Sequence, residues 1–268
     1  MYDTVLYEKR NSVGILSLNR PERMNAVIEA MYREMGSVLE EVRRDDSVRS
    51  LILTGSSFRK GDIVRQAFCA GADLKEHASG RRDHRAKRLY IELAHATTRA
   101  LHDFPKPVLA AVNGAARGAG AEMALNCDIL MMAHEATIAF PETGLATFVG
   151  GGVTWILPRL VGLMKARELI YTGRVLTGPE AAACGLALGS YPAGELMQEA
   201  LALAASLAEK GPLSLRLAKE HLWKSSERNL ETALHMETDA ILACMDTEDW
   251  AEGVAAFAEK RKPVYRGR

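Results

Sequence analysis

Short apolar runs alternate with longer amphipathic stretches through the first half of the chain, and this alternation constrains the fold more than any other feature. Buried strands are predicted at Val13–Leu18, Ser50–Gly55 and Val108–Val112. Helices are predicted at about Val27–Arg44 and Arg82–Asp103, where apolar residues recur at helical spacing. Strands that alternate with helices usually pair in parallel and are buried on both faces, so the pattern predicts an α/β core.

The last part of the chain has a different pattern. From about Glu195 onward only helical periodicity is visible, and we expect its leucines to be core residues, like Met31 and Met35 nearer the N-terminus. No shift in composition separates this part as an independent domain. We therefore expect a core over residues 1–194, followed by a helical region over residues 195–268. The segment Ser56–Gln66 is predicted to be a polar loop.

Composition excludes several classes of protein. The 34 Lys and Arg residues equal the 34 Asp and Glu residues, so net charge offers no attraction to nucleic acid or an acidic membrane. The four cysteines are far apart without a CxxC pair, which argues against a zinc site or disulfide framework and indicates a reducing compartment. The histidines show no HxxxH or HExxH spacing, so no metal is expected. With no leader-like segment and no apolar run near ~20 residues, we expect a soluble, cytoplasmic protein.

A glycine-rich segment, Val112–Glu122, is the first candidate for chemistry. A strand ends there, small residues permit close backbone approach, and a helix begins, so free N–H groups could bind an anion or a developing oxyanion. It is not a dinucleotide-binding fingerprint, because Met123 stands where Gly or Ala is needed, and no Gly-Lys-Ser/Thr follows as in a P-loop. The plainer interpretation is a tightly packed strand-to-helix turn.

Two glutamates stand in apolar, glycine-rich surroundings. Glu122 lies just inside the predicted helix, and Glu142 follows Pro141 after a short apolar strand. Each can be explained as an acid favoured in the first turn of a helix. Glutamate is seldom buried without a purpose, however, and two carboxylates in a dry cleft can supply an acid and a base at neutral pH.

A third small-residue segment, Phe68–Glu76, follows the Ser50–Gly55 strand and its loop. It can bring a backbone N–H close to a ligand ahead of a helix, or it can be a turn capped by Asp73.

Taken together, these segments resemble the crotonase, or enoyl-CoA hydratase/isomerase, superfamily over essentially the whole chain. The order and spacing of the matching pieces carry the resemblance. The matching pieces are Leu18–Pro21 with Asn25-Ala26, Ala70–Glu76, Pro107–Gly114, Gly118–Glu122, Cys127–Ile129, Phe140–Glu142, Leu176–Ala181 with Gly185-Leu186, and Phe257–Arg261. The resemblance implies a spiral of ββα units with a helical C-terminal region that joins subunits into a homotrimer or a hexamer.

The resemblance also implies a site and a reaction of lipid and fatty acid metabolism. Its substrate would be an acyl-CoA thioester whose carbonyl is held in an oxyanion hole by the amides of Ala72 and Ala119, with Glu122 and Glu142 as catalytic residues. No further cofactor is implied, since coenzyme A is part of the substrate. The residues implied to contact substrate or CoA are Ala70, Ala72, Asp73, Leu74, Lys75, Gly118, Ala119 and Gly150.

The chain departs from the hydratase pattern in places. Ala119 stands where glycine is usual, and Gly152–Ile156 replaces the usual Gly-Gly-Thr-Gln-Arg. Trp155 and Phe148 could reshape the acyl pocket, which leaves chain length and branching open. The Ser56–Gln66 segment is longer than usual, and we expect an exposed insertion.

The sequence also leaves activities other than enoyl-CoA hydration open. A Δ3-Δ2-enoyl-CoA isomerase needs one well-placed glutamate, and a branched-chain, methylglutaconyl-type hydratase would resemble this chain in its C-terminal third. A non-enzyme alternative is an RNA-binding protein on the same scaffold, suggested by a basic run of Arg81, Arg82, Arg85, Lys87 and Arg88. A solvated helix face is the favoured explanation of that run, so no nucleic acid is expected.

Overall fold

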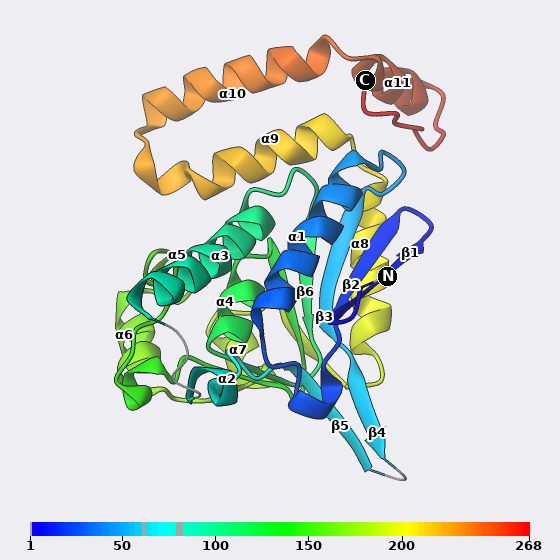
Figure 1. The fold of residues 1–268 in the computed structure, drawn as a ribbon. Coiled ribbons are helices and arrows are strands. Elements are labelled where there is room, and N and C mark those ends of the chain that lie inside the picture. The colour runs from blue at the N-terminus through cyan, green and yellow to red at the C-terminus, as the bar shows by residue number, and fades with distance from the viewer. Residues whose placement is uncertain (1, 61–62, 79–82) are drawn as a thin grey trace.

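The computed structural model describes residues 2–60, 63–78 and 83–268. One sheet contains most of the strands predicted from the apolar runs, and its neighbouring strands are parallel except β1 and β2, which are antiparallel (Figure 1). In spatial order it consists of β1 (Val5–Arg10), β2 (Val13–Leu18), β3 (Ser50–Gly55), β6 (Val108–Val112), β8 (Ile129–Ala133) and β11 (Gly189–Tyr191).

A second sheet of mostly short strands lies beside the first. Its order is β10 (Leu176–Thr177), β9 (Thr137–Ala139), β7 (Ala115–Arg117), β5 (Ile63–Cys69) and β4 (Ser57–Lys60). The chain passes from the first sheet to the second through tight turns. At one of them a Cβ on Gly114 would lie 2.4 Å from the carbonyl oxygen of Gln66, so only glycine allows β5 and β7 to approach this closely.

The repeating unit is two strands, one in each sheet, followed by helix. The units are β3, β5 and α3 (His84–His102), then β6, β7 and α4 (Ala119–Leu125), then β8, β9 and α5 (Val153–Val161). The remaining helices of the core are α1 (Glu29–Arg44), α2 (Leu74–Ala78), α6 (Leu163–Thr172) and α7 (Gly178–Ala183). This arrangement confirms the α/β class and the spiral of ββα units.

The predicted loop Ser56–Gln66 is wrong. The segment contains β4 and the first part of β5, which pair antiparallel with Ser57 opposite Gln66 and Lys60 opposite Ile63. These two strands project from the body of the molecule (Figure 1). The charged residues made this segment read as a loop, although its aromatic and β-branched residues Phe58, Ile63 and Val64 favour strands.

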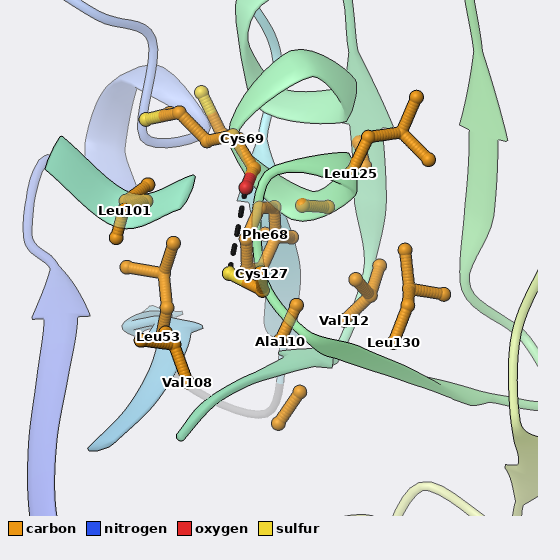
Figure 2. Close-up of a cluster of buried hydrophobic side chains, with 14 of the residues drawn as sticks. Leu53, Phe68, Cys69, Leu101, Val108, Ala110, Val112, Leu125, Cys127 and Leu130 are labelled. Atoms are coloured by element: carbon orange, nitrogen blue, oxygen red, sulfur yellow. Dashed lines mark hydrogen bonds between the residues drawn. The ribbon is translucent and has the colours of Figure 1, made fainter. Parts of the chain in front are cut away.

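The core lies between the helices and the two sheets. Figure 2 shows Phe68, Leu53 and Leu101 among the side chains packed around Cys127, and all three are fully buried. The thiol of Cys127 donates to the carbonyl oxygen of Met123 at 3.4 Å, the contact dashed in Figure 2. Burial raises the pKa of the Cys69 thiol to about 12, so this cysteine stays protonated and is not a nucleophile.

The C-terminal helices divide into two groups. The first, α8 (Leu196–Ala208), packs against β3 and β6, just beyond the predicted domain boundary at residue 195. Beyond it, α9 (Pro212–Trp223), α10 (Leu230–Met245) and α11 (Glu248–Ala258) form an arch over one end of the core (Figure 1).

The expectation that the C-terminal leucines are core residues is wrong for the arch. Leu222, Leu230 and Leu234 are 72, 75 and 53 % exposed, whereas Met31 and Met35 are fully buried as expected. Helical periodicity marks an apolar face, and it does not say whether that face packs within the same chain. Among the described residues, no helix is long and apolar enough to cross a membrane.

Candidate active site

The glycine-rich turn between β7 and α4 forms one wall of the site. Gly118 has φ 48° and ψ −119°, a conformation that residues with a Cβ seldom adopt, and it precedes the first helical residue, Ala119. No side chain caps this helix start in the described part of the chain. The amide of Ala119 is thus one of the N–H groups that the helix itself leaves unbonded.

The segment around Ala72 lies against this turn. Val27 donates to Gly71 at 2.8 Å and accepts from Asp73 at 2.9 Å, so this bridge uses the residues on either side of Ala72 and not the Ala72 amide. A Cβ on Gly71 would lie 2.9 Å from the carbonyl oxygen of Arg117 and 3.9 Å from the nitrogen of Ala119. The two segments predicted to supply main-chain donors are therefore neighbours.

Glu122 lies one turn into α4 and is 8 % exposed. Its Oε1 atom accepts a hydrogen bond from the amide of Gly150 at 2.8 Å. Burial raises the pKa of the Glu122 carboxyl, and the Gly150 hydrogen bond partly opposes that rise. Its partner is a loop amide outside α4, so a first-turn role in the helix does not account for its position.

Glu142 begins a short 3-10 helix, Glu142–Leu145, and is 7 % exposed. Its Oε2 atom is buried without a hydrogen-bond partner among the described residues. A Cβ on Gly118 would lie 2.9 Å from its Oε1 atom, which places this carboxylate at the start of α4. Burial raises the pKa of Glu142, and the charge of Glu122 raises it further.

The geometry therefore gathers four predicted features at one place. The Glu142 carboxylate lies beside Gly118, Glu122 follows one helical turn later with its amide bonded to the Gly118 oxygen at 2.9 Å, and the Ala72 segment borders the same turn. Two carboxyl groups with raised pKa values next to main-chain donors can exchange protons with a substrate whose carbonyl accepts hydrogen bonds.

The other predicted contacts lie along the approach to this turn. Leu74 is 58 % exposed and Lys75 is exposed, both at the start of α2. Asp73 is engaged instead with Arg20, at 3.2 Å, and with the amide of Lys75. Burial opposes ionisation of Asp73, but the hydrogen bonds from Arg20 and Lys75 outweigh it and lower the Asp73 pKa. Ala70 is exposed, and its amide donates to Met24 at 3.0 Å.

The sequence interpretation missed two residues of the site. Asn126 donates from its Nδ2 atom to the carbonyl oxygens of Gly151, at 2.7 Å, and of Glu122, at 2.8 Å. It thereby joins the end of α4 to the loop that binds Glu122. Its position four residues after Glu122, on the same helix face, was the available signal. His95 of α3 also reaches this loop, because a Cβ on Gly150 would lie 3.3 Å from its Nε2 atom.

Phe148 and Trp155, the two residues expected to reshape the acyl pocket, lie in different surroundings from each other. Phe148 is 74 % exposed. Trp155 packs in a ring cluster with His102 and Trp223, with both ring centroids 6.0 Å away, while Arg159 lies 3.9 Å over its face.

Part of the basic run lies in α3, within the described residues, and there it has the surroundings of a solvated helix face. Arg88 pairs with Glu92 at 2.8 Å, as expected of a solvated helix face, while Arg81 and Arg82 lie outside the described residues. No group of three or more metal-ligating side chains occurs in residues 2–60, 63–78 and 83–268.

Comparison with known proteins identifies the family of the chain. Residues 8–268 match the family model described as enoyl-CoA hydratase/isomerase. The chain belongs to the enoyl-CoA hydratase/isomerase family. Within this family it is 36 % identical to a crotonyl-CoA hydratase of Syntrophomonas wolfei, with 98 % of each chain covered. It is 34 % identical to a short-chain-enoyl-CoA hydratase of Clostridium acetobutylicum, over 97 % of this chain and 96 % of that one.

A solved family structure has the same fold. The crystal structure of an enoyl-CoA hydratase from Bacillus anthracis superposes with a TM-score of 0.92 at 36 % identity, covering 99 % of this chain and all of the other. This match extends to the C-terminal helices, and it assigns the chain to the crotonase fold.

Proposed function

We propose that this protein is an enoyl-CoA hydratase, a lyase that adds water reversibly to a 2-enoyl-CoA thioester. The observation that carries the proposal is the pair of buried carboxylates, Glu122 and Glu142, at the start of a helix whose first amide is uncapped. Relatives of similar length carry the names crotonyl-CoA hydratase and short-chain-enoyl-CoA hydratase, which supports the same reaction.

The thioester carbonyl is held by the amides of Ala72 and Ala119. When water adds to the double bond, negative charge develops on this oxygen as an enolate. Two preorganised N–H groups stabilise that charge in the transition state, and a donor of this kind is worth about 3 kcal/mol. Ala119 retains the amide despite its Cβ, so the departure from glycine does not remove the donor.

The two glutamates divide the proton transfers. Glu122 accepts a proton from the attacking water as the new C–O bond forms at Cβ, and Glu142 delivers a proton to Cα as the enolate collapses to the thioester. Raised pKa values suit both tasks: Glu142 holds a proton more readily, and Glu122 is a stronger base, than an exposed glutamate.

The remaining parts of the proposal concern the bound substrate and assembly. The Ala70–Lys75 segment and Gly118 meet coenzyme A and the thioester, and Gly150 faces the acyl group. The exposed apolar face of α9–α11 joins copies of the chain into a homotrimer or a hexamer, because such a face is seldom left open to water. A monomer by light scattering at micromolar concentration would overturn the assembly alone.

The test of function is the loss of enoyl absorbance with crotonyl-CoA, measured for wild type, Glu122→Gln and Glu142→Gln. Wild type should turn over, and each variant should lose at least about 100-fold in kcat, as expected for a positioned acid or base. Full activity in either variant would overturn its role. Turnover of a 3-enoyl-CoA with no hydration of a 2-enoyl-CoA would instead identify a Δ3-Δ2-enoyl-CoA isomerase.

A further inference from the structure

The Gly150 amide that binds Glu122 belongs to the turn from which α5 starts. The carbonyl oxygen of Gly150 accepts from the amide of Val153, the first residue of α5, at 3.0 Å. The Gly152 oxygen accepts from the amide of Trp155 at 2.9 Å. The donor that holds the Glu122 carboxylate is therefore tied to the first turn of α5, and a shift of this turn would move it.

The first turn of α5 is held only partly by the hydrogen bonds of the helix itself. Pro158 lies inside α5, and a proline has no N–H to donate to the carbonyl four residues earlier, which is that of Thr154. Gly151 and Gly152 precede the helix with φ values of 57° and 76°, so no Cβ restrains the chain there. Side-chain contacts therefore help to fix this turn.

Trp155 is the side chain through which this turn contacts the arch. Val153 and Ile156 hold the inner side of α5 in the core, whereas Trp155 is half-buried and borders cavities of about 390 and 520 Å³. Its ring stacks on Trp223 of α9, with the planes inclined by 27° and the centroids 6.0 Å apart. The outer side of the turn thus rests on a ring from a distant part of the chain.

Trp223 is itself fixed to the core. Its Nε1 atom donates to Oδ1 of Asp128 at 3.4 Å. Lys219, one turn earlier in α9, donates to Oδ2 of the same carboxylate at 2.9 Å. Asp128 therefore holds the end of α9 in place, and Trp223 presents a fixed surface to Trp155.

Arg159 makes a second connection between α5 and the arch. Its Nη1 atom donates to the carbonyl oxygen of Trp155 at 2.6 Å, while its Nε atom donates to Ser226 at 2.9 Å. Ser226 lies in the short 3-10 helix Ser225–Glu227 that follows α9. Two contacts from neighbouring parts of the arch thus converge on Trp155.

We propose that Trp155 is a positioning residue for the reaction, and that the docked arch, through Trp223, keeps the Gly150 amide directed at the Glu122 carboxylate. The inference rests on the proposed function, in which Glu122 is the base. Trp155 stands where the chain departs from the hydratase pattern, and it acts on Glu122 through the main chain of the glycine loop.

The first test is hydration of crotonyl-CoA by Trp155→Ala and Trp155→Phe. Alanine frees the turn and should lower kcat by about 10- to 100-fold, with KM changed by less than about threefold. Phenylalanine keeps a ring in the stack and should restore at least about a third of the wild-type kcat. Thr154→Ala, at an exposed position in the same turn, is the control and should match wild type. A wild-type kcat in Trp155→Ala would overturn the proposal, whatever its Tm.

Trp223→Leu tests the same support from the arch. It removes the ring partner but keeps an apolar side chain, so it also serves as the test if Trp155→Ala does not fold. Its kcat should fall by about 10-fold. The double variant should be no slower than Trp155→Ala alone, because both changes remove one contact. A wild-type kcat in Trp223→Leu, or additive losses in the double variant, would overturn the role of the arch.

The pH profile separates positioning from a general loss of structure. Burial raises the pKa of Glu122 and the Gly150 hydrogen bond opposes that rise, so a weaker bond raises this pKa further. Because the base must be ionised, the acid limb of kcat/KM should move to higher pH by about 0.5–1 unit in Trp155→Ala. The variant leaves in place the other titratable groups near Glu122, which are Glu142, Tyr32, Cys69 and His95. An unmoved limb would contradict the proposal.

Amide hydrogen exchange keeps this inference distinct from the proposed function, since it needs no catalysis. A peptide that contains Gly150 should exchange faster in Trp155→Ala than in wild type, and Thr154→Ala should leave its rate unchanged. Faster exchange would support the positioning contact even if wild type failed to hydrate crotonyl-CoA. Unchanged exchange and an unchanged kcat, alongside rapid hydration by wild type, would overturn the inference and leave the hydratase proposal intact.

Discussion

The carboxylate of Glu122 accepts a hydrogen bond at 2.8 Å from the amide of Gly150, 28 residues further along the chain. Asn126 reinforces this connection, because its amide group bonds both to the Gly151 oxygen and to the Glu122 oxygen. The Gly150 amide therefore holds the Glu122 carboxylate directly, and Asn126 ties the glycine loop to the main chain of α4 at Glu122. Such support fixes a reacting group in one orientation, which transition-state stabilisation requires.

Gly150→Ala should damage activity more than stability. Its backbone tolerates alanine, but the added Cβ would lie 3.1 and 3.2 Å from the two Glu122 carboxylate oxygens, which must move. A displacement of this kind can lower kcat/KM by about 10- to 100-fold. Gly144→Ala is the matched control, since no atom lies within 4 Å of that position. Equal hydration rates for both variants would show that the carboxylate does not depend on its place beside Gly150.

Much of the first sheet could be predicted from the apolar runs. β2, β3 and β6 begin and end where the sequence indicated, because each is a run of apolar residues bounded by polar, glycine or proline residues. β7, β10 and β11 have three, two and three residues. Segments this short carry no periodicity, and they become strands only through pairing with distant partners.

The residues of the candidate site also divide into those that the sequence indicated and those that it did not. Gly118–Glu122 and Glu142 stood out because glycines and acids in apolar surroundings are unusual. His95 did not, because a histidine on an amphipathic helix is ordinary and its importance depends on α3 lying beside the Gly150 loop. That the leucines of α10 are exposed in the single chain was equally beyond the reach of periodicity.

Gly36→Ala should stabilise the protein without affecting activity. Gly36 lies inside α1, and no atom lies within 4 Å of a Cβ built there, so alanine removes backbone freedom from the unfolded chain without a clash. The expected gain in unfolding free energy is about 0.5–1 kcal/mol. Gly14→Ala makes the same chemical change in β2, where Leu51 and Tyr7 lie 3.1 and 3.2 Å away. Gly14→Ala should therefore lower the unfolding free energy. Denaturant unfolding of both variants will show whether their changes in unfolding free energy have opposite signs.

Asp128→Ala should release α9 from the core. The Asp128 carboxylate accepts from the Val108 amide at 2.8 Å and from Lys219 of α9 at 2.9 Å, with the charged side chains 18 and 11 % exposed. Its removal leaves a mostly buried ammonium group unpaired, a loss of about 3–5 kcal/mol. Glu29→Ala breaks the exposed pair with Arg33 and should change stability by less than about 1 kcal/mol. Equal unfolding free energies for the two variants would contradict the anchoring role of Asp128.

Glu142→Gln should make the protein more stable at neutral pH while it removes activity. Burial, and then the charge of Glu122, raise the folded-state pKa of Glu142 above its unfolded value of about 4.3. Between these two pKa values the folded protein binds more protons than the unfolded chain, so its stability falls as pH rises through this window. Glutamine does not ionise and avoids this loss. The gain in Tm should therefore be small near pH 4 and should grow toward pH 8.

Glu180→Gln provides a control of opposite sign. Hydrogen bonds from the backbone and then the side chain of Thr177 lower the pKa of the exposed Glu180, so its contribution to stability is present above the unfolded pKa and is lost as pH falls through the lowered value. Glutamine at this position should lower Tm at neutral pH. If Glu142→Gln also melted below wild type at about pH 8, the Glu142 carboxylate would have to be stabilised by its surroundings. Its proposed readiness to carry a proton would then be contradicted.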